Sequence, residues 1–216
     1  MQTPATETET ERRAERLDEV VQLIRAKVAA DAADTLAGFV QRYFGHVDPE
    51  DLAERPVADL YGAALSHWSF ARKREPGRAR VRAFNPTIAE HGWQSTHTVI
   101  EIVNDDMPFL VDSTTTEINR QGLTLHLIEH PIFAVERGAD GSLGAVWPRN
   151  EAPAAARESW MHIEIDRLVD PQQRTELVAG IERVLGNVRA AVEDWKPMVA
   201  RLQDRKSTRL NSSHRH

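Results

Sequence analysis

The sequence predicts an α+β fold, in which an N-terminal helical subdomain precedes an antiparallel sheet covered by helices on one face. Apolar residues recur at helical spacing through residues 11–75. After a basic stretch, the pattern changes to short runs rich in β-branched residues. The later segments run strand, helix, three strands and helix, an order typical of an antiparallel sheet with helices packed against it.

The helical subdomain is predicted over residues 11–75. The apolar positions with helical spacing fall in three segments, Leu17–Val28, Leu36–Phe44 and Val57–Trp68. A helix start is also indicated at Asp48-Pro49, because aspartate can cap the first free N–H groups and proline is tolerated in the first turn.

Two terminal segments lack the periodicity of a packed element. Residues 1–10 are polar and repetitive, so we expect a disordered leader. Residues 204–216 resemble the in-frame translation of a common DNA-sequencing adapter, so we expect them not to be native. On this interpretation the chain is a fragment of a longer polypeptide.

The sheet domain is predicted over residues 79–203. The strand candidates are Arg80–Asn85, His97–Val103, Leu123–Arg137, Leu143–Trp147 and Trp160–Ile165. The Gly138–Gly141 segment predicts a hairpin turn between the third and fourth of these strands.

Two helices are expected within this domain. The first follows the second strand, with Asp105 or Asp106 as its cap, Pro108 in its first turn and Gly122 as its end. The second is long and begins near Pro171.

Charge and composition argue against several partners. The formal net charge is −6, which does not favour binding to nucleic acid or to an anionic membrane. The basic run at residues 71–82 is either a phosphate-binding patch or a solvated linker, and Pro76 and Gly77 favour the linker. Cysteine is absent, which excludes disulfides and thiolate nucleophiles here and fits a cytoplasmic location.

No dinucleotide-binding glycine motif or phosphate loop occurs in the sequence, so we predict neither catalytic nor cofactor-binding residues in this chain. His126 and His130, with His162 from another strand, could form a zinc site if the strands adjoin. The alternative is that these histidines lie on the open face of a half-covered sheet, and we predict no metal site.

A second polar cluster consists of Asn104, Asp105, Asp106 and Asp112. These oxygens could hold a hard cation, but their spacing is not that of a calcium loop. Helix capping explains part of the cluster, and again we predict no metal.

The run from Asp106 to Leu110, followed by a helix, Gly122 and an alternating strand, resembles an ACT-type ligand-binding domain, which has a ferredoxin-like fold. That family has an acid-x-Pro-Gly-Leu turn at this point, and effector amino acids commonly bind near it. Phe109 stands where the family has glycine, the residue that lets a ligand approach the backbone closely. The resemblance implies effector binding by Asn104, Asp105, Asp106, Pro108, Phe109 and Leu110.

A longer resemblance covers nearly all of residues 11–203. Its segments are Gly92–Thr98, Val103–Ser113, His126–Pro131, Glu158–Ile163 and Val192–Trp195 with Met198. They resemble the N-terminal region of the large bacterial NAD-specific glutamate dehydrogenases. The resemblance implies a non-catalytic regulatory and assembly portion. The oxidative deamination of L-glutamate to 2-oxoglutarate, and the NAD that it uses, would belong to a part of the enzyme that this chain lacks.

The partners implied by this resemblance are the rest of the parent chain, further copies in a homo-oligomer and an amino-acid effector. Two other functions stay open on the sequence. A stand-alone ACT-like amino-acid sensor requires a ligand pocket at Asp105–Leu110. A small metal-dependent enzyme requires that the three histidines bind a metal.

Overall fold

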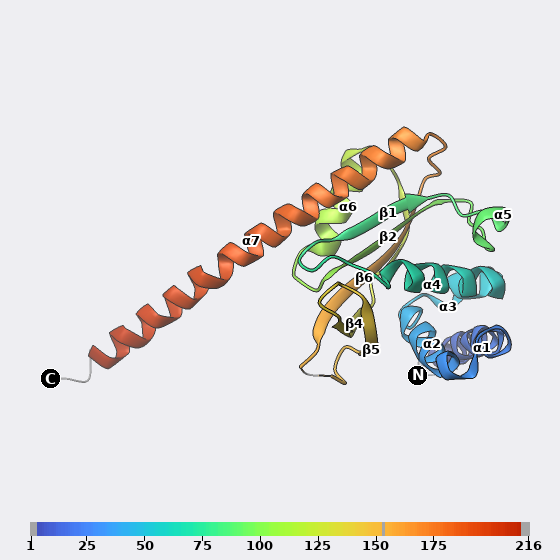
Figure 1. Ribbon diagram of the computed structural model, residues 1–216, viewed down its shortest axis with the longest axis horizontal. Helices are drawn as coiled ribbons and strands as arrows, with labels where there is room; N and C mark the ends of the chain where they lie inside the picture. Colours follow the sequence, from blue (N-terminus) through green and yellow to red (C-terminus); the bar gives the residue numbers. More distant parts are fainter. Residues whose placement is uncertain (1–3, 153, 213–216) are drawn as a thin grey trace.

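A computed structural model of the chain describes residues 4–152 and 154–212, with side chains described for residues 10–152 and 154–195. Its elements are α1 (Pro4–Lys27), α2 (Ala30–Tyr43), α3 (Pro49–Glu54), α4 (Val57–Ala71), β1 (Arg80–Phe84), α5 (Ile88–His91), β2 (Thr98–Asp105), α6 (Leu110–Arg120), β3 (Leu125–Glu129), β4 (Ile132–Arg137), β5 (Leu143–Pro148), β6 (Ala156–Ile165) and α7 (Pro171–Ser212) (Figure 1). Within this described part of the chain, no helix combines the length and apolar character needed to cross a bilayer.

The strands form one antiparallel sheet in the order β1-β2-β6-β4-β5, and β3 also pairs with β6. β3 pairs with residues 162–165 of β6 and β4 pairs with residues 156–159, so both lie along the same edge of β6. The single strand predicted over Leu123–Arg137 is therefore two strands. Pro131, which has no N–H to donate to a ladder, lies at the break.

The arrangement confirms the ACT-like α+β fold. β2, α6, the β3–β4 edge, β6 and α7 follow the first five elements of a ferredoxin-like βαββαβ unit, with β5 added to the outer edge. In such a unit the last strand lies beside the first. Here β1, which comes earlier in the sequence, occupies that place beside β2.

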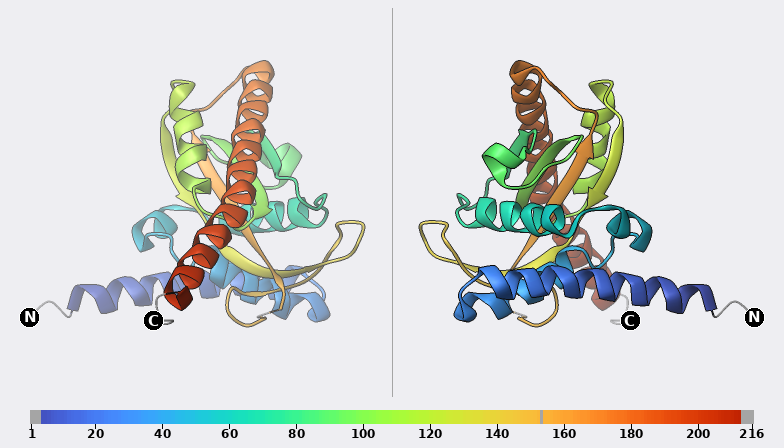
Figure 2. Two further views of the ribbon diagram at one scale, coloured as in Figure 1. Left: turned by 90° about the vertical axis from the view of Figure 1, so that its left-hand side faces the viewer. Right: turned by 90° about the vertical axis from the view of Figure 1, so that its right-hand side faces the viewer.

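Helices cover both faces of the sheet, so the prediction that one face stays open is wrong (Figure 2). α6 and α7 pack on one face, where the core includes Ile100, Ile102, Ile118, Ile163, Leu177 and Ile181. The helical subdomain packs on the other face, where the core includes Phe39, Tyr43, Leu60, Val103, Phe133 and Trp160. Because strand side chains alternate, β2 and β6 supply residues to both cores.

The predicted start of α6 is wrong, and its predicted end is confirmed. α6 begins at Leu110 after an N-cap at Phe109, without a side-chain cap. Asp105 does not cap the helix because its carboxylate is held by arginines. Gly122 has a φ of 75° and ends α6 in a Schellman motif, in which the next residue bonds back to Ile118.

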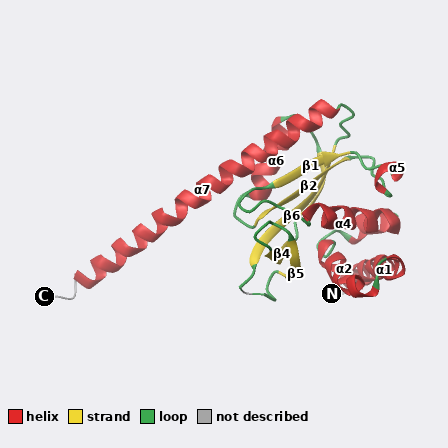
Figure 3. Cartoon of the chain, viewed as in Figure 1, coloured by secondary structure: helices red, strands yellow, loops and turns green. Residues whose placement is uncertain are grey.

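The first and the last helix of the chain are longer than the sequence indicates. α1 begins at Pro4, inside the segment predicted as a disordered leader. Extending a formed helix costs little compared with nucleating one, so residues 4–10 can continue the packed part of α1. α7 runs through Ser212, away from the sheet (Figure 3), and includes part of the 204–216 segment; residues 213–216 lie outside the described residues.

Local helix signals at two other places are confirmed. Asp48 caps α3 by accepting a hydrogen bond from the Glu50 N–H at 2.8 Å. Asp170 accepts from the Gln172 N–H at 2.9 Å and so starts α7.

The basic run at residues 71–82 is not a uniformly solvated linker. The Arg74 side chain is 4% exposed and pairs with Glu158. Arg82 pairs with Glu101 on the neighbouring strand. Carboxylates at interior strand positions, which the charge run itself does not reveal, draw these arginines inward.

Candidate functional site

The turn after β2 carries the residues predicted to bind an effector. The Asp105 carboxylate accepts hydrogen bonds from Arg74 at 2.5 Å and pairs with Arg189 at 2.7 Å. Arg189 also donates to Oδ1 of Asn104 at 2.9 Å. Burial raises the pKa of Asp105, but the two arginines outweigh it and hold the pKa below its ordinary value. Two guanidinium groups thus supply positive charge where the sequence suggested a hard cation.

The remaining residues of this turn point into different environments. Leu110 is 1% exposed and belongs to the core under α6 and α7. Asp106 donates its backbone N–H to the carbonyl of Arg157 at 2.9 Å. Pro108 and Phe109 are exposed. Effector binding by these residues stays a prediction.

Phe109 has a φ of 70°, a left-handed conformation in which the Cβ of a bulky residue is strained. It lines an apolar groove of about 340 Å³ between α6 and α7. The other lining residues are Ser113, Val184, Asn187, Val188, Ala191, Val192 and Trp195. Phe109 and Trp195 are 57% and 55% exposed, and we call this surface the Phe109–Trp195 groove.

Replacing Phe109 with glycine is expected to leave the free energy of unfolding unchanged or to raise it by up to about 1 kcal/mol. Relief of the left-handed strain, roughly 1–2 kcal/mol, offsets the roughly 0.5–1 kcal/mol that glycine costs in chain entropy. Phe109→Ala is the control, since it keeps the Cβ and hence the strain, and it should be less stable than Phe109→Gly. Urea denaturation followed by circular dichroism measures the free energy of unfolding of both variants. A glycine variant less stable than the alanine variant would contradict the expectation.

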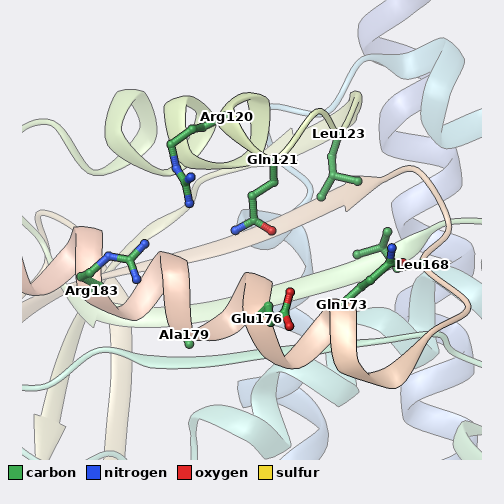
Figure 4. A pocket seen from close by; sticks show the side chains of 8 residues that line it. All are labelled: Arg120, Gln121, Leu123, Leu168, Gln173, Glu176, Ala179 and Arg183. Carbon is green, nitrogen blue, oxygen red and sulfur yellow. The ribbon is translucent and has the colours of Figure 1, made fainter.

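A second cavity, of about 550 Å³, lies at the other end of α6 (Figure 4). Arg120 and Arg183 face it from α6 and α7. On α6, the Glu117 carboxylate accepts two hydrogen bonds from Arg120 at 2.8 Å, which lower the pKa of Glu117 to about 2. A Cβ on Gly180 would lie 2.2 Å from this carboxylate, so the glycine permits close packing of α6 on α7.

The three histidines considered as zinc ligands have separate partners. Their side chains contact Asp166 at 2.8 Å for His126, Ser159 at 2.5 Å for His130 and Glu164 at 3.3 Å for His162. His130 lies beyond the end of β3, so strand alternation does not place it beside His126. Among the described side chains, those of residues 10–152 and 154–195, no group of three or more His, Cys, Asp or Glu could hold a metal ion.

A row of polar side chains, which the sequence did not predict, crosses the sheet beneath the helical subdomain. The strand register places Arg82, Glu101, His162 and Glu129 opposite one another on β1, β2, β6 and β3. Glu101, His162 and Glu129 are 0%, 2% and 6% exposed. One sequence signal could have indicated this row: charged residues at alternate positions within two otherwise apolar strands. The expectation of an open face places such residues in solvent, whereas the helical subdomain covers them.

One end of this row has a strong ion pair, and a second strong ion pair lies beside the row. Glu101 accepts from Arg82 at 2.6 and 2.8 Å, yet its burial still raises its pKa. Glu164, beside His162 on β6, accepts from Arg55 at 2.6 and 3.0 Å. Burial acts to raise the pKa of Glu164, but His162 and Arg55 hold it well below its ordinary value. Arg55 therefore ties the segment after α3 to the sheet.

A buried tyrosine–histidine pair connects the helical subdomain to the same face. Nε2 of His67 lies 3.2 Å from the carbonyl oxygen of Ile102, which can only accept, so Nε2 carries the proton. Nδ1 of His67 then accepts from the Tyr43 hydroxyl at 2.8 Å. Burial keeps the pKa of His67 well below its ordinary value, so this imidazole stays neutral.

A cavity of about 510 Å³ lies where the helical subdomain meets the loop before β2. Its wall includes Arg55, Leu60, Trp93, His97 and Glu164. Nδ1 of His97 lies 3.2 Å from the Glu164 carboxylate. The cavity thus opens beside the ion pair that joins the two halves of the molecule.

Comparison with known proteins agrees with this fold. Residues 39–181 match the glutamate dehydrogenase ACT1 domain family. The chain is 41% identical over 191 residues to the NAD-specific glutamate dehydrogenase of Halomonas elongata. The aligned segment covers 88% of this chain and 12% of that protein. It is 36% identical over 167 residues to the NAD-specific glutamate dehydrogenase of Pseudomonas aeruginosa, and this aligned segment covers 77% of this chain and 10% of that protein. The enzyme of the same name from Mycobacterium tuberculosis is 26% identical over 189 residues, with 82% of this chain and 11% of that protein covered. The chain thus spans about a tenth of the length of these relatives.

Proposed function

This chain belongs to the NAD-specific glutamate dehydrogenase family, as its N-terminal ACT1 region, and on that premise we propose that it serves regulation and assembly rather than catalysis. The reaction of the parent enzyme would be the NAD-dependent oxidative deamination of L-glutamate to 2-oxoglutarate in the cytoplasm. The residues that bind NAD and glutamate would lie in other parts of that enzyme. The partners of this region would be those parts and further copies of the enzyme.

The observation that carries this proposal is the Phe109–Trp195 groove. Both faces of the sheet are covered, so the groove between α6 and α7 is where large apolar side chains are exposed together. Exposed apolar patches of this kind are typical of interaction surfaces. A strained phenylalanine beside the β2–α6 turn supports the same role, because strain is commonly retained at functional positions.

An amino-acid effector at residues 104–110 is a finer form of the proposal. Asp105 already pairs with Arg74 and Arg189, so the ammonium group of an amino acid would have to compete with two guanidinium groups. An effector that displaced Arg189 would release α7 from the end of β2. This exchange offers a physical route from ligand binding to helix position.

The test uses the full-length enzyme that carries this region. Phe109→Ser combined with Trp195→Ser is expected to alter its oligomeric mass, measured by light scattering, or its response to added amino acids. The KM values for NAD and glutamate in the absence of effector should stay unchanged. Ile88→Ser is the matched control, because Ile88 is also 57% exposed but does not line the groove. The regulatory and assembly role fails if the double variant matches this control in mass and response.

A further inference from the structure

The side of α7 that lines the Phe109–Trp195 groove carries an apolar stripe that continues past the sheet. Its residues, Val184, Val188, Ala191 and Trp195, recur at spacings of four, three and four positions. This spacing keeps them on one side of the helix and is the repeat of helices that pair with other helices. Leu185 is the last buried residue of α7 among the described side chains, and beyond it the helix runs away from the sheet (Figure 1). The stripe therefore reaches past the surface that α7 itself covers.

Two opposite charges border this stripe on the same side. Arg183 directly precedes Val184, and Asp194 directly precedes Trp195. Eleven positions separate the two charged residues, which corresponds to a net rotation of about 20° and a rise of roughly 16 Å along the helix. Both residues are exposed. Arg183 lies 3.6 Å from Glu117 without a hydrogen bond to a described residue, and Asp194 has no ion pair among the described side chains.

We propose that this surface binds a second copy of the chain, with the two α7 helices antiparallel across a twofold axis near residues 188 and 189. The inference rests on the proposed assembly function and names its partner and geometry. Such an axis places position 183 of each helix opposite position 194 of the other, so Arg183 would face Asp194 twice in one pair of chains. A parallel pair would instead bring Arg183 beside Arg183, and like charges at a contact are unfavourable.

The same arrangement covers the exposed apolar side chains. Asn187 and Ala191 lie near the axis, and their short side chains allow two helices to approach closely. The projecting half of each α7 would then lie along the half of the other α7 that packs on its own sheet. Phe109 and Trp195, 57% and 55% exposed, would lose part of their contact with water, and aromatic side chains of this kind are enriched in the centres of interfaces.

The first measurement is the mass in solution of the 216-residue chain by sedimentation equilibrium. The mass should rise with protein concentration toward twice that of one chain, because a contact between two helix faces is small and therefore reversible. A mass that stays at that of one chain at every concentration overturns the proposal and leaves the groove to another part of the parent enzyme.

Exchange of the two charges tests the antiparallel geometry. Arg183→Glu and Asp194→Arg, made singly, should each weaken association on the order of tenfold, because each turns two attractive pairs into two repulsive ones. The double variant restores both pairs with the charges exchanged, so its association constant should return to within about twofold of the wild-type value. Circular dichroism checks that each variant is folded. A double variant that associates no better than the single variants overturns the antiparallel pairing.

Glu193→Arg is the matched control for Asp194→Arg, since it changes the net charge by the same amount at the adjacent position. Glu193 is exposed, but the helix turns about 100° between the two residues, which places Glu193 on the side of α7 away from the stripe. Its replacement should leave association unchanged. A loss as large as that of Asp194→Arg would reflect net charge alone and would count against the pairing.

The two proposals can fail separately. If the chain stays monomeric while Phe109→Ser with Trp195→Ser still alters the full-length enzyme, only the pairing of α7 helices is wrong. If the full-length enzyme is also unaltered by that double variant, the proposed function is wrong as well.

Discussion

Replacing Glu158 with alanine is expected to lower the free energy of unfolding by about 3–5 kcal/mol, the usual cost of removing one partner from a buried ion pair. The Glu158 side chain is 0% exposed. It accepts hydrogen bonds from Arg74 at 2.8 and 3.0 Å, from Arg137 at 2.6 and 2.8 Å and from the Trp160 indole at 3.1 Å. Arg137, 10% exposed, would lose this carboxylate, and Arg74, 4% exposed, would keep only its pair with Asp105.

Urea denaturation at neutral pH measures this loss. Glu151→Ala is the matched control, since Glu151 is exposed in the loop before β6 and its removal should change the free energy of unfolding by less than about 0.5 kcal/mol. Glu158→Gln should give an intermediate loss, because the amide retains the shape but not the charge. A loss below about 1 kcal/mol for Glu158→Ala would mean that water or a repacked side chain replaces the carboxylate without cost.

The pH dependence of Glu158 has a definite sign. Burial acts to raise its pKa, but Arg137 and Arg74 hold the pKa below its ordinary value. The stabilisation from this group is therefore present above the unfolded pKa and is lost as pH falls through the folded one. The difference in the free energy of unfolding between wild type and Glu158→Ala should accordingly become smaller in acid.

Replacing Gly62 with alanine is expected to lower the free energy of unfolding by about 1–3 kcal/mol, the range for an overpacked core. An added Cβ would lie 2.3 Å from Cβ and 2.4 Å from Cγ of Trp93, which is 2% exposed. These atoms are the root of the Trp93 side chain, so rotation about its side-chain bonds cannot relieve the clash. α4 and the loop that carries Trp93 would have to separate.

Gly186→Ala is the control for this prediction. Gly186 also lies within a helix, α7, but a Cβ there would meet none of the described residues' heavy atoms within 4 Å. Alanine should therefore raise the free energy of unfolding by roughly 0.5–1 kcal/mol, its ordinary helix preference over glycine. The midpoints of thermal and urea unfolding should fall for Gly62→Ala and rise for Gly186→Ala. Equal effects at the two positions would contradict the close packing of Gly62 on Trp93.

The two predictions concern the contacts that join the helical subdomain to the ACT-like sheet. Gly62 lets α4 approach the loop before β2, and Glu158 forms an ion pair with Arg74, which lies in the connection after α4. Arg74 also pairs with Asp105 at the β2–α6 turn, and Asp105 pairs with Arg189 of α7. Ion pairs thus connect the segment after α4, through Asp105 at the end of β2, to Arg189 of α7.

The sequence by itself determined the features that depend on neighbouring residues. Helical spacing marked the helices around Leu36–Phe44 and Val57–Trp68, and alternation with β-branched residues marked the strands. Short-range signals were reliable for the same reason: Asp48 caps its own helix, and Gly122 supplies the left-handed conformation that ends α6. The Asp106–Leu110 turn carried the family resemblance because its residues are contiguous.

Only the tertiary structure decided which faces are covered and where charges are buried. His162 lies beneath the helical subdomain, so a residue expected in solvent has a buried nitrogen without a hydrogen-bond partner among the described residues. Arg74 reaches Glu158 across 84 positions, and Arg55 reaches Glu164 across 109. Local periodicity carries no information about such pairs, because each side chain's hydrogen bonds, burial and pKa depend on helices and strands that come together only when the chain folds.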